Sequence, residues 1–169
     1  MRPKGHIHGM AASPVQSTLD GGDAPTVEAV LAEAEPAQRE LLAGVRRSLR
    51  ELPDVSEGLV YDRQSRIWAP TFYLGLEELC HLRWGRNAAV TVPIRSRSEL
   101  PVLLQAREVR DDLLAIVEVA RDYGGVRWPS FVVRDGEDVA AVVDLIGVRA
   151  QLLRGIDPRN ATLDQWTRP

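Results

Sequence analysis

The central part of the chain reads GLVYDRQSRIWAPTFYLGLEELCHLRWGRNAAVTVPI (residues 58–94), and apolar and polar side chains alternate through much of it. Alternation with a period of two is typical of β-strands that bury one face. Glycines and polar clusters divide the stretch into four segments, which we expect to be strands: 58–62, 67–74, 79–84 and 88–94. Four short strands with short connections predict an antiparallel meander.

Helical periodicity precedes this region. Thr26 can cap a short helix over 27–34, because a threonine hydroxyl satisfies a free N–H of the first turn. Pro36 suits the first turn of a second helix, where its missing N–H costs nothing, and Pro53 ends that helix. Apolar residues at spacings of three and four give the second helix one face to bury.

The same two periods return after the central stretch. An apolar stripe predicts a helix over 109–120, and residues 126–134 predict a fifth strand. Asp135 can cap a last helix that Gly155 closes. We therefore expect an α+β fold, in which an antiparallel sheet of about five strands has helices from both ends of the chain packed on one face.

The ends of the chain differ in composition from its centre. A length of 169 residues argues for one domain, which we place at 25–155, between a disordered leader at 1–24 and a polar tail at 156–169. The leader holds His6 and His8, but it supplies no thiol that could complete a metal site with them, and ordering a loose segment is costly. We expect no metal site there.

Charge and cysteine content exclude several classes of function. The 21 basic and 24 acidic residues leave a net charge of −3, which argues against a nucleic-acid partner. A membrane helix needs about 20 consecutive apolar residues, and the sequence contains no such run and no secretory signal. The single cysteine excludes an intrachain disulfide and a multi-cysteine metal site. We expect a cytoplasmic protein.

The third predicted strand separates two kinds of side chain. Cys80, Leu82 and Trp84 share one face, whereas His81 and Arg83 share the other. Cys80 and His81 therefore cannot act together as a nucleophile and its base. We expect Cys80 to be a small residue of the core.

The face opposite the core carries our candidate site. His81 and Arg83 on the third strand, Tyr73 on the second and Thr91 on the fourth all project there, and Thr71 accompanies them. These side chains can bind an anion or another small molecule, so we predict a ligand site of Tyr73, His81, Arg83 and Thr91. The alternative is a sheet face that only water covers.

No motif for a catalytic nucleophile, a metalloprotease or a phosphate loop is present in the sequence, so we predict no catalytic residues and no cofactor. Carboxylates that could hold a metal ion are interleaved with arginines, which is typical of a solvated, ion-paired surface. They are Glu28, Glu33, Glu35 and Glu40, and separately Glu108, Asp111 and Asp112. We therefore predict no metal ligands among them.

A resemblance to a known family lies in residues 27–62, which resemble the opening of the YdhG-like domain-of-unknown-function proteins of bacteria. The matching residues are Pro36, Gln38, Arg39, Leu41, Leu42, Glu57, Gly58 and Tyr61. The segment YGGVRW (residues 123–128) and the helix after it look like the end of a related uncharacterised bacterial family. The resemblance implies an α+β fold, and some YdhG-like proteins are labelled as iron chaperones or frataxin-like.

These observations give one expected function and two alternatives. We expect a non-catalytic module that binds a small molecule or a protein partner through the open sheet face. The family resemblance adds iron binding or metal delivery as an alternative. The polar residues of the sheet face add an enzyme that acts on a small substrate. Neither the ligand nor the oligomeric state follows from the sequence.

Overall fold

A computed structural model describes residues 25–62 and 66–156 of the chain. Its elements are α1 (Val27–Leu31), α2 (Pro36–Arg50), β1 (Val55–Asp62), β2 (Ile67–Leu74), β3 (Glu77–Arg83), β4 (Ala89–Thr91), β5 (Ile94–Arg95), α3 (Leu100–Leu103), α4 (Asp111–Val119), β6 (Asp122–Tyr123), β7 (Val126–Arg127), β8 (Ser130–Val132) and α5 (Gly136–Leu153). The predicted leader, and the predicted tail after its first residue, Ile156, lie outside the described residues. No helix in the described ranges is long and apolar enough to span a membrane.

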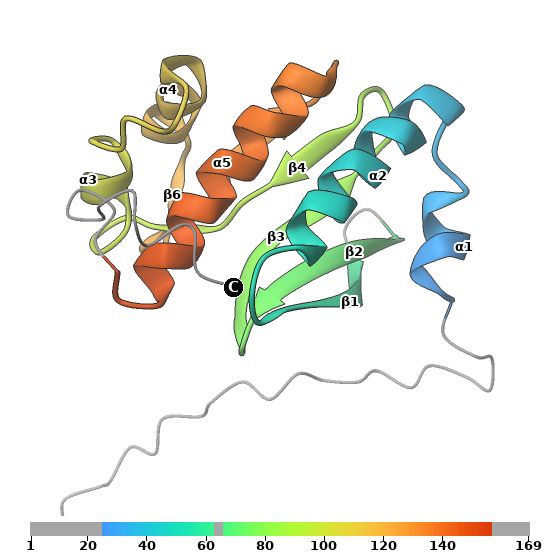
Figure 1. Cartoon of the computed structure of the whole chain (residues 1–169), viewed down its shortest axis with the longest axis horizontal. Coiled ribbons are helices and arrows are strands. Elements are labelled where there is room, and N and C mark those ends of the chain that lie inside the picture. Colours follow the sequence, from blue (N-terminus) through green and yellow to red (C-terminus); the bar gives the residue numbers. More distant parts are fainter. Residues whose placement is uncertain (1–24, 63–65, 157–169) are drawn as a thin grey trace, which may run out of the picture.

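The main sheet has five strands in the order β1-β2-β3-β4-β8, and all neighbours are antiparallel. Helices α2 and α5 lie side by side across one face of this sheet (Figure 1). The core lies between the two layers, and its largest fully buried side chains include Leu42, Leu49, Phe72, Leu145 and Ile146. The structure thus confirms the predicted α+β fold, with an antiparallel sheet and helices from both ends of the chain on one face.

The predicted helix starts are confirmed in atomic detail. The Thr26 hydroxyl accepts a hydrogen bond from the Ala29 N–H over 3.1 Å, and Pro36 is the first residue of α2. The Asp135 carboxylate accepts from the Asp138 N–H over 2.9 Å at the start of α5. Each side chain satisfies a donor that has no partner inside its helix, so each helix begins where the sequence predicts.

Two predicted strands were wrong in one respect, because each is divided by a proline. Residues 88–94 form β4 and β5, separated at Pro93, and residues 126–134 form β7 and β8, separated at Pro129. Proline has no N–H to donate to a ladder, so both strands bend at these positions. The segments on the far side of these prolines, β5 and β7, form a second, small sheet with β6. Between the two sheets, the Val92 N–H donates to the Pro129 carbonyl over 3.1 Å.

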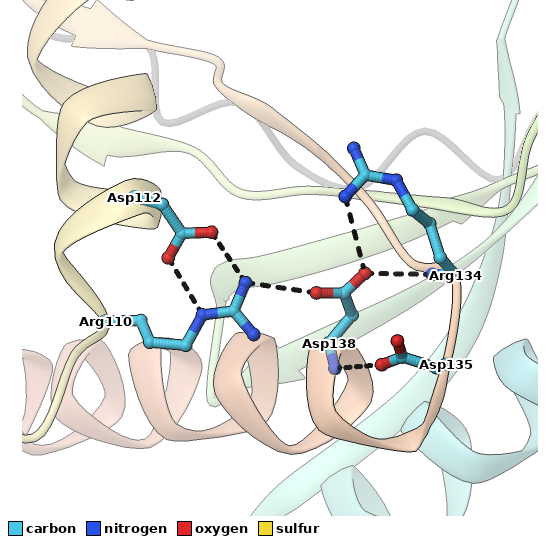
Figure 2. A network of polar contacts seen from close by, with 5 residues as sticks. All are labelled: Arg110, Asp112, Arg134, Asp135 and Asp138. Atoms are coloured by element: carbon cyan, nitrogen blue, oxygen red, sulfur yellow. Dashed lines mark hydrogen bonds and ion pairs between the residues drawn. The ribbon is translucent and has the colours of Figure 1, made fainter.

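An ionic network joins the start of α4 to the start of α5 (Figure 2). The Arg110 guanidinium lies between two carboxylates, 2.6 Å from Asp112 Oδ2 and 3.1 Å from Asp138 Oδ1. The other oxygen of Asp138 accepts from the Arg134 N–H over 3.1 Å, while Asp135 caps the helix. The acidic cluster at 108–112, one of the carboxylate groups considered above, thus contributes Asp112 to a structural contact.

Candidate functional site

Helices α2 and α5 cover one face of the five-stranded sheet (Figure 1), and we call the opposite face the open face. A pocket of about 560 Å³ lies on the open face. Its wall combines three kinds of side chain: apolar, aromatic and polar. They are Val60, Tyr61, Asp62, Ile67, Ala69, Thr71, Glu78, His81, Arg83, Thr91, Trp128 and Ser130. All five strands of the sheet and the bend before β8 contribute to it, so residues 70 positions apart in the chain meet there.

The pocket lies where β2 and β3 part. The ladder between these strands runs from the Leu74–Glu77 pair only to the Thr71–His81 pair, whereas β1 follows β2 as far as Ile67. Pro70 is the neighbour of Thr71, where the β2–β3 ladder ends. Because proline has no N–H to donate, it cannot extend the ladder. A proline within a strand is typical of an edge strand or a bulge. β2 is nevertheless an inner strand, and the irregularity of the β2–β3 ladder lies two residues further along, at Phe72.

That irregularity is a β-bulge in β3. Phe72 pairs with Cys80 and Tyr73 pairs with Glu78, so Leu79 is an extra residue without an opposite partner. A bulge shifts the alternation of side chains by one position. Leu79 and Cys80 are consequently both fully buried, and Glu78 comes to the open face together with His81, three residues later.

A buried arginine supports the bulge from the covered face. Arg149 of α5 donates through Nη1 to the carbonyls of Glu78, at 2.5 Å, and Leu79, at 3.2 Å. Its Nε donates to Glu99 Oε2 over 2.9 Å, and the two residues are only 2% and 3% exposed. A bulge leaves ladder groups without partners, and a charged donor at this point satisfies two of them.

Glu78 selects the tautomer of His81. Glu78 Oε1 lies 2.8 Å from His81 Nδ1. An ionised carboxylate can only accept, so Nδ1 carries the proton that it donates, and in the neutral form of the ring Nε2 keeps its lone pair. The side chains are 28% and 20% exposed, so solvent and ligands reach this pair. The pair therefore offers a hydrogen-bond acceptor with a defined direction.

Trp128 forms the aromatic wall beside this pair. Its ring centroid is 6.2 Å from that of His81 at an interplanar angle of 39°, and the residue is 42% exposed. The bend at Pro129 releases Trp128 from the strand ladder, while Arg127 donates to the Ala120 carbonyl over 3.1 Å at the end of α4. A large aromatic ring is thus held partly in solvent at the pocket wall.

Several other polar side chains of the pocket are engaged in contacts within the protein. Arg83 Nη2 lies 3.5 Å from Asp62 Oδ2. The Thr91 hydroxyl donates to Ser130 Oγ over 3.3 Å, and the Thr71 hydroxyl donates to the Ala69 carbonyl over 3.0 Å. These contacts hold the side chains in place before any ligand arrives, which lowers the entropic cost of binding.

The structure brings three of the four predicted site residues into this pocket: His81, Arg83 and Thr91. Tyr73 lies further along the same face, where its ring would contact a side chain at position 58, and it does not line the pocket. Burial and the negative charge of Glu78 raise the pKa of the Tyr73 hydroxyl. Whether any of the four binds a ligand stays a prediction.

Sequence reasoning missed Glu78 and Trp128. A regular strand places Glu78 opposite His81, but the adjacent apolar residues Leu79 and Cys80 break the alternation and are a signal of the bulge. Trp128 carried no local signal, because its place beside His81 depends on the pairing of β4 with β8.

Cys80 is fully buried on the covered face, which confirms that it is a core residue. Burial raises the pKa of its thiol well above the usual range, so the reactive thiolate is disfavoured. Among the described residues, no three or more histidine, cysteine or acidic side chains gather as a metal site would require. The metal role implied by the family resemblance stays a prediction.

Comparison of the chain with models of known families, with curated proteins and with solved structures finds no match. The class of protein that the geometry defines is therefore an α+β domain with a pocket on the open face of its sheet. The resemblance to the YdhG-like proteins stays a prediction.

Proposed function

We propose that the protein is a non-catalytic binding module that holds a small organic molecule in the open-face pocket. The observation that carries this proposal is the partly exposed Trp128 ring in a hollow beside a fixed acid–histidine pair. Binding sites for small molecules typically measure roughly 300–1,000 Å³ and combine an apolar lining with a few placed polar groups. The pocket of about 560 Å³ has this size and this composition.

The distribution of apolar side chains favours a small molecule over a protein partner. Val60 and Trp128 are both more than 40% exposed, and both face the same pocket rather than forming a flat patch. Ile67 and Ala69 continue the apolar lining. A ligand that enters a hollow contacts these residues from several sides, whereas a flat partner surface cannot reach them together.

A fragment screen tests this proposal. We would follow the Trp128 indole N–H and the His81 ring signals by two-dimensional NMR while small organic fragments are added in pools. We expect a subset of fragments to shift both signals. In the Trp128→Ala variant these fragments should lose most of their affinity, whereas Tyr123→Ala, which removes another exposed ring outside the pocket, should leave it unchanged. A screen without shifts at the pocket would contradict the proposal.

A second candidate function rests on the Glu78–His81 pair. A histidine whose Nδ1 is held by a carboxylate presents Nε2 as a proton acceptor, which is the usual arrangement of a general base. The same fragments, incubated with the protein and followed by one-dimensional NMR, distinguish the two functions. Chemical conversion that His81→Gln abolishes while binding persists would favour an enzyme, and unchanged fragments favour a binding module.

A further inference from the structure

We propose that the ligand of the open-face pocket is a small organic cation, in which a protonated amine or amidine is carried on an apolar body of about the size of one ring. This inference rests on the proposed function and gives it a substrate class. It follows from the charge of the lining, from the direction of the acceptors and from the aromatic wall.

The first argument is the charge of the lining residues. They include two carboxylates, Asp62 and Glu78, and one guanidinium, Arg83. Arg83 is already paired with Asp62 at 3.5 Å. At a pH of about 8 a histidine ring is ordinarily neutral and adds no positive charge. Glu78 is therefore the charge that remains uncompensated within the lining, and it favours a positive ligand group over a negative one.

The second argument is the direction of the polar groups. His81 Nε2 has a lone pair because Nδ1 donates to Glu78, so this position requires a donor on the ligand. Glu78 has a second oxygen, and carboxylate oxygens only accept. Ammonium and amidinium groups carry several N–H donors and no acceptor, so they match both residues at once.

The third argument is the wall around these acceptors. The face of a tryptophan ring attracts cations, and Trp128 lies directly beside His81. Val60, Ile67 and Ala69 line the same pocket and can contact an apolar body next to the charged group. The arrangement therefore fits an amphiphilic cation better than a strongly hydrated one such as a bare metal ion.

Three probes test the inference: 3-phenylpropylamine, 3-phenylpropanol and 3-phenylpropionate. They share a phenyl ring on a short alkyl chain and differ in the charge of the terminal group. Their affinities would be measured by NMR titration of the Trp128 and His81 signals in the full chain at a pH of about 8, where histidine is ordinarily neutral. We expect the amine to bind about tenfold more tightly than the acid, since a cation–π contact and one nearby carboxylate together supply roughly this factor. The alcohol should lie between them.

Variants at two adjacent positions test whether the charge of Glu78 causes the preference for the amine. Glu78→Gln keeps the shape of the side chain and removes its charge, so the preference for the amine over the acid should fall from about tenfold to the roughly twofold that the cation–π contact with Trp128 supplies. Glu77→Gln is the matched control, because Glu77 pairs with Arg95 at 2.6 Å and does not line the pocket. It should leave the preference unchanged, and backbone amide spectra of both variants would show that the fold is intact.

The outcomes separate the two proposals. If the acid binds more tightly than the amine, or if all three probes bind equally, the cation inference is overturned while a binding pocket remains. If the amine shifts nothing in the pocket although fragments of other charge do, the inference is also overturned. If neither these probes nor any fragment of the screen shifts the pocket signals, the proposed function itself fails.

Discussion

The two faces of β3 use the same kind of side-chain pair for different purposes. On the covered face, Arg149 and Glu99 are almost completely buried. The Nε and Nη1 atoms of the Arg149 guanidinium donate hydrogen bonds to groups of the protein. On the open face, Glu78 and His81 lie equally close together, but the pair borders a pocket that solvent enters. An acid–base pair alone does not indicate whether its role is structural or in binding. The exposure of the pair to solvent is needed to distinguish the two roles.

The two faces are also physically linked. The carbonyls that Arg149 binds belong to Glu78 and Leu79, the residues of the bulge. The bulge in turn places the Glu78 side chain on the open face beside His81. The covered face therefore contributes to the geometry of the pocket without touching a ligand.

Removal of the buried guanidinium should have the largest effect on stability. In Arg149→Met, the buried Glu99 carboxylate loses its close partner and keeps only the Arg95 guanidinium at 3.8 Å, and two bulge carbonyls lose their donor. Breaking one half of a buried ion pair costs about 3–5 kcal/mol, and we expect a loss of this size in the free energy of unfolding. Urea denaturation followed by circular dichroism measures it.

The control for this variant is Arg134→Met. Arg134 also contacts a carboxylate through its side chain, at 3.9 Å from Asp138, but that side chain is 75% exposed. An exposed pair contributes roughly 0–1 kcal/mol, so the control should lose no more than this. A loss in Arg149→Met as small as in the control would contradict the structural role of the buried pair.

Adjacent residues of β3 allow a closer comparison of the two faces. Cys80→Ser buries a hydroxyl in an apolar site and should cost about 1–3 kcal/mol of unfolding free energy. His81→Gln changes a side chain that solvent reaches, and we expect a loss of about 1 kcal/mol or less. In the wild type, a thiol reagent should modify Cys80 only after unfolding, because the thiol is buried and its pKa is raised. Rapid labelling of the folded protein would contradict this burial.

The smallest effect concerns the exposed Arg110–Asp112 pair of the network in Figure 2 and its dependence on pH. Hydrogen bonding to Arg110 lowers the pKa of the Asp112 carboxyl below its usual value of 3.8. A carboxyl with a lowered pKa in the folded state stabilises the protein above its unfolded pKa, and this contribution is lost as the pH falls through the folded value. Stability should therefore decrease below a pH of about 4.

Arg110→Gln tests this contribution together with that of the Arg110–Asp138 contact, because it removes both. Thermal unfolding of the wild type and the variant would be compared between neutral and acidic pH. We expect the difference between the two proteins to be present at neutral pH and to shrink in acid, where Asp112 is protonated in both. A difference that grows on acidification would show that the pair acts in another way.

Local patterns in the sequence predicted most of the fold. Thr26, Pro36 and Asp135 define helix starts by their own chemistry, and alternation placed His81 and Cys80 on opposite faces of one strand. The bends at Pro93 and Pro129 were missed because long apolar runs favour one continuous strand over two shorter ones. Proline at those positions was the signal that decides between them.

The candidate site was predicted only in part, for a physical reason. His81, Arg83 and Thr91 project from neighbouring strands of the meander, so their proximity follows from local order along the chain. Glu78 depends on a bulge that Arg149 supports from 70 residues away, and Trp128 depends on the pairing of β4 with β8. Such long-range contacts are set by the packing of the whole domain, and no short segment encodes them.

The tautomer of the His81 ring tests the central claim most directly, since the claim is that a supported bulge brings Glu78 against Nδ1 and leaves Nε2 of this pocket-lining ring without the proton. Nitrogen-15 shifts of the two ring nitrogens, measured at a pH of about 8, report which of them carries the proton. We predict that Nδ1 is protonated and that Nε2 is not. A ring protonated at Nε2, or one that exchanges freely between both forms, would contradict the account.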